Sequence, residues 1–121
     1  MNIKATKDYC RSLAGVSEKE FAAPSHVLVF YVGDKQFAYF KTSQPEQWRF
    51  SIRVAAERFL ELTDQAGIKP ARYMQRFHWI SIVNIELHET DLIKTLIDGS
   101  YQKALSSLSK KAQLIITQPK S

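Results

Sequence analysis

The chain has 121 residues, of which 45% are hydrophobic and 24% charged, and its formal net charge is +5. This length and balance are typical of one globular domain, so we expect residues 1–121 to fold as a single unit. The single cysteine, Cys10, excludes an intramolecular disulfide and a cysteine-based zinc or iron–sulfur site. No apolar stretch is long enough for a membrane span or a secretory signal, so the sequence predicts a cytoplasmic protein without membrane contact.

The first third of the chain predicts a helix followed by a hairpin. Apolar side chains recur at helical spacing over residues 3–13, with Cys10 on the buried stripe. Residues 17–25 are polar and predict a connection without regular structure. Residues 26–32 are apolar on both faces, and a tight turn joins them to a second strand over 36–41.

The middle of the chain predicts a strand with one basic face. Over residues 48–54, apolar and polar side chains alternate, so Arg49, Ser51 and Arg53 are expected to point to solvent. A helix is predicted over 55–65, and a further alternating strand over 79–85. Trp48 and Trp79, which begin the two strands, are expected to be buried.

The last third predicts the longest helix. It begins at Thr90 and carries an apolar stripe as far as Leu108, whereas residues 110–117 fit either a helix or a strand. The element order is therefore α-β-β-β-α-β-β-α. Strands joined by hairpins, with helices gathered together, indicate an α+β two-layer sandwich with a mainly antiparallel sheet and helices on one side.

The sequence contains no catalytic signature. There is no glycine-rich phosphate loop, nucleophile elbow or zinc-binding helix motif, and the three histidines lie on separate elements, so we expect no cofactor, no metal site and no catalytic residue. His78 is the one acid–base candidate, because imidazole titrates near neutrality. An enzyme built on His78 would need a carboxylate or hydroxyl beside the ring, and the alternative is a structural histidine at a strand edge.

Basic residues are concentrated between Trp48 and Trp79, where six Lys and Arg stand against three acids. Such a surplus attracts polyanions over long range, although a solvated surface is the simpler explanation. Tyr73 lies between Arg72 and Arg76, and an aromatic ring among arginines suits nucleic acid.

Two segments resemble the MmcQ/YjbR-like family. Residues 67–79 share its glycine and proline before a His-Trp pair, here His78 and Trp79, and residues 96–101 share its Leu-Ile pair followed by Ser-Tyr. The resemblance implies a small α+β domain related in shape to type III secretion chaperones. It also implies a proposed double-wing DNA-binding role, and no enzymatic activity is attached to the family pattern.

Composition and resemblance together favour a non-catalytic domain that binds double-stranded DNA. The residues expected at the interface are Arg49, Arg53, Arg72, Arg76, Tyr73 and His78. The alternative from a different class is a protein-interaction or chaperone-like module, which would display an exposed apolar patch and form a dimer.

Overall fold

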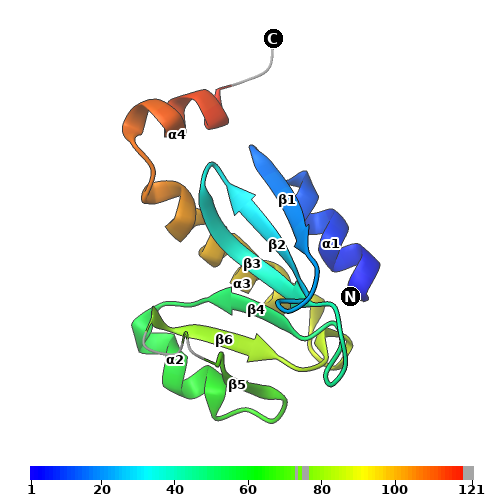
Figure 1. Ribbon diagram of the computed structural model, residues 1–121. Coiled ribbons are helices and arrows are strands. Elements are labelled where there is room, and N and C mark those ends of the chain that lie inside the picture. Colours follow the sequence, from blue (N-terminus) through cyan, green and yellow to red (C-terminus); the bar gives the residue numbers. More distant parts are fainter. Residues whose placement is uncertain (73, 75–76, 119–121) are drawn as a thin grey trace.

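The protein is an α+β sandwich built on one antiparallel sheet, which confirms the predicted fold class (Figure 1). The computed structural model describes residues 1–72, 74 and 77–118. The sheet has the strand order β1-β2-β3-β4-β6-β5. Its strands are β1 (Val16–Phe21), β2 (Val27–Val32), β3 (Lys35–Lys41), β4 (Phe50–Arg53), β5 (Ile68–Pro70) and β6 (Trp79–Ile82). The α-helices of the described residues are α1 (Ile3–Ser12), α2 (Ala56–Thr63), α3 (Thr90–Ser106) and α4 (Lys110–Thr117), and a short 3-10 turn, η2 (Ile85–Leu87), precedes α3.

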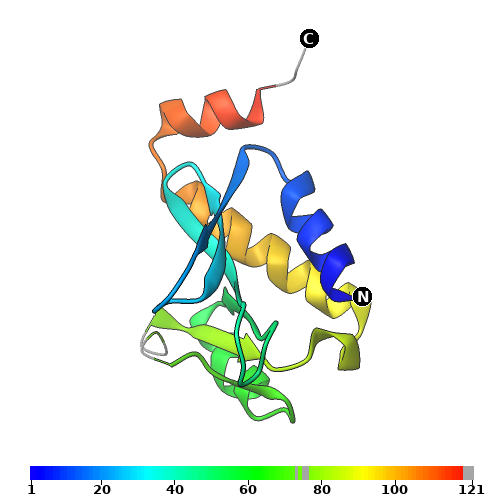
Figure 2. The same ribbon diagram turned by 45° about the vertical axis from the view of Figure 1, so that its right-hand side comes forward.

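The main core lies between one face of the sheet and the helices α1, α2 and α3. Figures 1 and 2 both show α1 and α3 on the same side of the strands. Each of these helices contributes fully buried side chains to a single cluster, among them Cys10, Leu62 and Ile97. Cys10 is therefore buried as predicted, and burial raises the pKa of its thiol to about 12.

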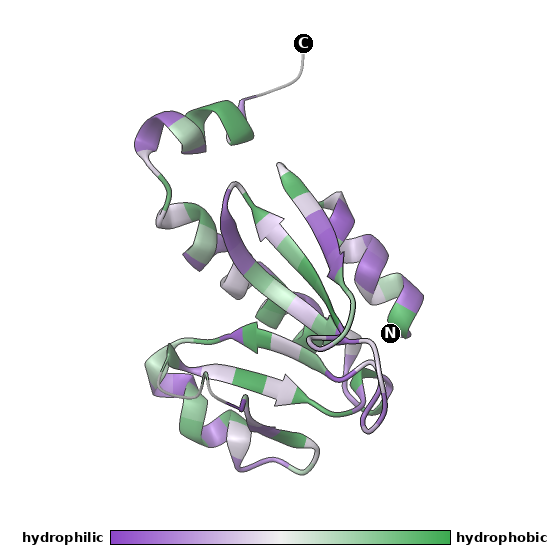
Figure 3. Cartoon of the chain, in the orientation of Figure 1, coloured by the Kyte–Doolittle hydropathy of each residue, from purple (hydrophilic) through white to green (hydrophobic). Residues whose placement is uncertain are grey.

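Strand β1 corrects the prediction of an irregular connection over residues 17–25. All six residues of Val16–Phe21 pair with β2 in an antiparallel ladder. The strand escapes sequence analysis because it is an edge strand whose charged side chains stay in solvent, as its purple colour in Figure 3 illustrates. Its partner β2 is apolar on both faces and requires a neighbour on each side.

Two predicted strands are shorter than expected. The strand over 48–54 begins only at Phe50, because Trp48 has a φ of 69°, which an extended strand cannot accommodate. Trp48 is half-buried, with its ring packed edge-on against Phe40. The strand over 79–85 ends at Ile82, and Ile85 instead starts the turn η2.

The sheet consists of two sets of strands that meet at one short junction. Phe30 pairs with Ala38 and Tyr31 with Gln36, so Phe37 is an extra residue that forms a bulge in β3. Strand β3 then pairs with β4 only over residues 38–40 and 50–52, which we call the β3–β4 junction. Because a bulge bends its strand, β1–β3 and β4–β6–β5 run at a steep angle to each other (Figure 1).

Residues 110–117, for which sequence left two possibilities, form the helix α4. The Ser109 hydroxyl caps it by accepting a hydrogen bond from the amide of Ala112. The helix buries none of its residues completely, and its partly buried Ile116 packs against the core beside Gly15. No helix within the described part of the chain has the length and apolarity needed to cross a bilayer.

Candidate nucleic-acid interface

The helices leave one face of the sheet uncovered, and we call it the open face (Figure 1). Ile52 belongs to the core beneath the helices, so its neighbours Ser51 and Arg53 point to the open face. Residues paired across a ladder point the same way. The ladders therefore add four side chains to this face, namely Tyr39, Lys69, Trp79 and Ser81.

The side chains at the centre of the open face are buried, contrary to the prediction that this strand surface faces solvent. Ser51 is completely buried, and its hydroxyl lies 2.7 Å from that of Ser81. The rings of Tyr39 and Trp79 meet across β4 with centroids 5.7 Å apart, since the small Ser51 side chain leaves room between them. Trp79 is only 4% exposed, so its predicted burial is confirmed, but on the open face and outside the main core.

A cleft with a strong excess of positive charge lies beside this buried centre. Its volume is about 480 Å³, and we call it the basic cleft. The described residues that line it are Lys41, Pro45, Glu46, Arg49, Lys69, Pro70, Arg72 and Ser81. Four cations thus face one carboxylate, which creates a local positive potential.

Glu46 organises two of the four cations. One of its oxygens accepts from Arg49 Nη1 at 2.7 Å, and Lys69 Nζ lies 2.9 Å from both oxygens. The hydrogen bond from Lys69, followed by that from Arg49, holds the pKa of the Glu46 carboxyl below its ordinary value. Lys41 donates to the carbonyl of Pro45 at the other side of the cleft. Arg72 is an exposed residue of the cleft lining.

Arg53 lies apart from the basic cleft, so it does not share a site with Arg49 and Arg72. Its Nε donates to the carbonyl of Phe77 at 3.0 Å, and its backbone amide donates to the hydroxyl of Ser100 at 3.1 Å. The same hydroxyl donates to the carbonyl of Phe37 at 2.6 Å. Ser100 thereby joins β3 to β4 just beyond the last paired residues of the β3–β4 junction.

His78 is held in place by its backbone and by a ring contact with α2. Its φ is 65°, its carbonyl accepts from the amide of Val54 at 2.9 Å, and its ring packs edge-on against Phe59 with centroids 5.5 Å apart. Among the described residues, the contact of the imidazole is this ring packing, and no carboxylate or hydroxyl is hydrogen-bonded to it as an enzyme built on His78 would require. Tyr73 and Arg76, the remaining predicted interface residues, lie outside the residues that the structure describes.

Sequence analysis did not single out Lys41, Glu46 or Lys69. Lys69 was visible as part of the basic surplus, and Lys41 follows Tyr39 by two positions, which places both on one strand face. No sequence pattern marks Glu46 as a site residue, because its role depends on a loop that brings it beside Lys69, 23 residues later in the chain. Within the described residues, no three His, Cys, Asp or Glu side chains gather as a metal site.

The Ser-Tyr pair of the resemblance has a clear structural role. Ser100 bridges the two sets of strands, and the hydroxyl of Tyr101 donates to the carbonyl of Ala14 at 2.6 Å. The Tyr101 ring also packs edge-on against Phe37, with centroids 5.5 Å apart. Both residues therefore tie α3 to distant parts of the chain.

Comparison with known proteins shows that this fold and its sequence family have been seen before. No curated protein is similar enough to count as a relative. A solved structure of a Deinococcus radiodurans protein with a DUF419 domain superposes with a TM-score of 0.82 at 24% identity, over 99% of this chain and 91% of that one. A Pseudomonas syringae protein superposes with a TM-score of 0.68 at 21% identity, over 86% of this chain and 99% of that one. Both share the fold, and the sequence model of the YjbR family matches residues 11–103. The chain belongs to the YjbR family.

Proposed function

We propose that this protein is a non-catalytic DNA-binding domain that contacts the phosphates of double-stranded DNA through its basic cleft. The observation that carries the proposal is the gathering of Lys41, Arg49, Lys69 and Arg72 around a single carboxylate. Phosphate contacts by such side chains supply most of the affinity of proteins that bind DNA without reading its sequence.

The electrostatics of the cleft suit a row of phosphates. Glu46 holds Arg49 and Lys69 in fixed positions, so less side-chain freedom is lost when a phosphate binds them. Tyr73, Arg76 and His78, which sequence analysis also assigned to the interface, remain part of the proposed contact, whereas Arg53 lines a separate cavity.

Duplex DNA fits the open face better than a single strand does. Single-stranded nucleic acid is bound by stacking bases on exposed aromatic rings. On the described part of the open face, Trp79 is 4% exposed and packed against Tyr39, so almost none of its ring is available for a base to stack on. The cleft therefore offers charge without a stacking platform, which suits a duplex whose bases stay paired.

Fluorescence anisotropy with a labelled duplex and the matching single strand tests this function. We expect the duplex to bind more tightly, with an affinity that falls steeply as salt rises. Lys69→Gln and Arg72→Gln should each weaken binding and lower the salt slope by about 1. Lys110→Gln, which removes the same charge from α4, serves as the matched control. The function is disproved if no duplex binds at about 50 mM salt, or if Lys110→Gln weakens binding as much as the cleft variants do.

A second candidate, a protein-interaction module, is supported by α4. Leu114 and Ile115 are 70% and 63% exposed, and Figure 3 shows this end of the helix in green. Exposed apolar residues of this size on a small domain commonly mark a contact surface. Light scattering is the test: a dimer that dissociates in Leu114→Ser would favour this function, and a monomer at all concentrations would count against it.

A further inference from the structure

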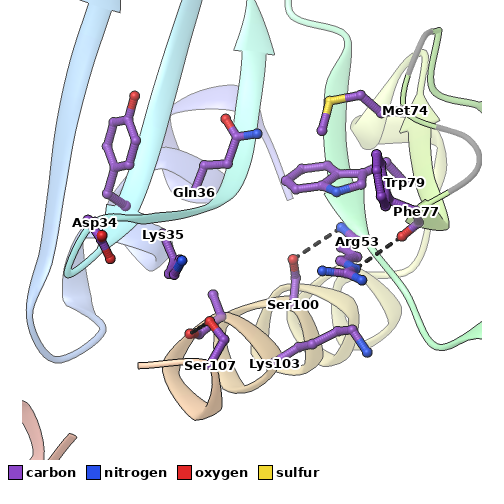
Figure 4. Close-up of a pocket in the computed structure, with 12 residues that line it drawn as sticks. Asp34, Lys35, Gln36, Arg53, Met74, Phe77, Trp79, Ser100, Lys103 and Ser107 are labelled. Atoms are coloured by element: carbon purple, nitrogen blue, oxygen red, sulfur yellow. Dashed lines mark hydrogen bonds between the residues drawn. The ribbon is translucent and has the colours of Figure 1, made fainter. Parts of the chain in front are cut away.

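A second cavity opens where the two sets of strands part. Its volume is about 440 Å³, within the range of small-molecule sites. It lies beyond the β3–β4 junction, between β3 on one side and Arg53 and Trp79 on the other, with α3 below (Figure 4). Among the described residues that line it are Tyr31, Lys35, Gln36, Arg53, Trp79 and Lys103.

The cavity results from the backbone geometry of β3 and β4. The bulge at Phe37 turns β3 away from β4, so the two strands no longer share backbone hydrogen bonds beyond Ala38 and Ile52. Ser100 spans the gap with one hydroxyl, bonded to the Phe37 carbonyl and the Arg53 amide. The strands are thus held apart at a fixed separation, and the space above Ser100 stays open (Figure 4).

Positive charge dominates this cavity. Three cations, Lys35, Arg53 and Lys103, stand against one acid, Asp34. None of these four side chains forms an ion pair with another described residue. This differs from the basic cleft, where Glu46 pairs with two of the cations.

The guanidinium of Arg53 is held in an orientation that suits an anion. Its Nε is committed to the Phe77 carbonyl, which fixes the plane of the guanidinium, while its two Nη atoms make no hydrogen bond to any described residue. A fixed guanidinium binds a carboxylate or phosphate through two parallel hydrogen bonds. Lys103 lies on the same side of the cavity in Figure 4, and its flexible stem lets the ammonium turn toward an anion at Arg53.

The remaining walls suit an apolar body. Tyr31, Met74 and Trp79 contribute aromatic and thioether surface, and Gln36 adds an amide at the rim (Figure 4). The indole N–H of Trp79 has no hydrogen-bond acceptor among the described residues, so it is a further donor at the wall. Charge at one side and apolar surface at the other are the usual plan of a site for small organic molecules.

We propose that this cavity binds a small organic anion, with its carboxylate or phosphate on Arg53 and Lys103 and its apolar or aromatic part against Tyr31 and the small part of the Trp79 ring that lines the cavity. This site shares no residue with the basic cleft, so it stands whether or not the cleft binds DNA.

Proton–nitrogen NMR spectra of the full chain test the proposal, because the two tryptophans report on different places. Trp79 lines the cavity and Trp48 does not, and a Trp48→Phe variant assigns their indole signals. Titration with phenyl phosphate and with benzoate should shift the Trp79 signal to saturation and leave that of Trp48 in place. The stronger of the two identifies the anionic group. Phenol and inorganic phosphate, each carrying half of the ligand, should bind at least tenfold more weakly.

Charge variants decide where the anion lies. Lys103→Gln removes an exposed side chain that makes no bond in the described structure, so the fold is retained, and we expect about tenfold weaker binding. Arg53→Gln should weaken binding at least as much. Arg72→Gln, in the basic cleft, should change nothing. The proposal is overturned if neither anion shifts Trp79 up to about 10 mM, if both tryptophans shift alike, or if Arg72→Gln has the effect expected of Lys103→Gln.

Discussion

The two ends of the β3–β4 junction differ in how the two strands are connected. At the end near the basic cleft, the chain continues to pair: the amide of Lys41 donates to the carbonyl of Arg49, and the amide of Trp48 donates to that of Lys41. At the other end, the strands diverge and a single serine hydroxyl from α3 connects them. We call these the closed end and the split end.

Backbone pairing at each end determines which group holds the cations there. At the closed end, the loop returns beside the sheet and brings Glu46 to Arg49 and Lys69, so the cations are held in place by a carboxylate. At the split end, no carboxylate among the described residues pairs with Arg53, which is instead held by a backbone carbonyl. A neutral anchor leaves the full charge of the guanidinium available for a ligand.

Removal of the Ser100 hydroxyl should have the largest effect on this arrangement. Ser100 is 2% exposed, and Ser100→Ala leaves the Phe37 carbonyl and the Arg53 amide without their partner. We expect the free energy of unfolding to fall by about 2–3 kcal/mol, measured by urea denaturation. Ser106→Ala, on the exposed side of the same helix, should change it by less than about 0.5 kcal/mol. Equal effects of the two variants would show that the split end needs no bridge.

Removal of one hydroxyl from the buried Ser51–Ser81 pair should have a smaller effect. Ser51→Ala leaves the Ser81 hydroxyl buried without a partner, and we expect a loss of about 1–2 kcal/mol in unfolding free energy. The double variant Ser51→Ala/Ser81→Ala removes both groups and should lose less than the sum of the single variants. Additive losses in this double-mutant cycle would mean that the two hydroxyls act independently.

Neutralisation of Glu46 should have the smallest effect, and one that depends on pH. Because its pKa is lowered in the folded state, the ionised carboxylate stabilises the protein above its unfolded pKa, and this stabilisation is lost as pH falls through the folded pKa. Glu46→Gln should therefore be slightly less stable than the parent protein at about pH 7, and the difference should be smaller at about pH 3.

Asp34→Asn provides the matched change at the split end. Asp34 forms no ion pair with a described residue, so its neutralisation should leave the urea midpoint unchanged at both pH values. The comparison between the two ends fails if Asp34→Asn reproduces the pH dependence of Glu46→Gln.

Much of the fold could be predicted because local patterns decide it. The helical stripe after Thr90, the hairpin around Gly33 and the alternation on either side of Ile52 all correspond to observed elements. Strand β1 could not be recognised, since an edge strand is stabilised by backbone pairing with β2 and needs no apolar side chains of its own.

The candidate sites could be predicted only in part from the sequence, because both depend on strand pairing between residues far apart in the chain. Arg49 and Arg53 occupy the same strand region, yet they lie at opposite ends of the β3–β4 junction and face different cavities. Ser51 between them was expected to be in solvent, and it is buried because Tyr39 and Trp79 meet above it from other strands. Alternation predicts the face of a side chain, but not what covers it.

The Ser100 bridge also has a consequence for the order of folding. Its two hydrogen bonds join residues that are 47 and 63 positions apart in sequence. Such distant contacts form late, because the entropy of closing the intervening chain is lost before they contribute. We therefore expect the two sets of strands to form first and to lock together only when α3 docks, so that the last long helix of the chain completes the sheet.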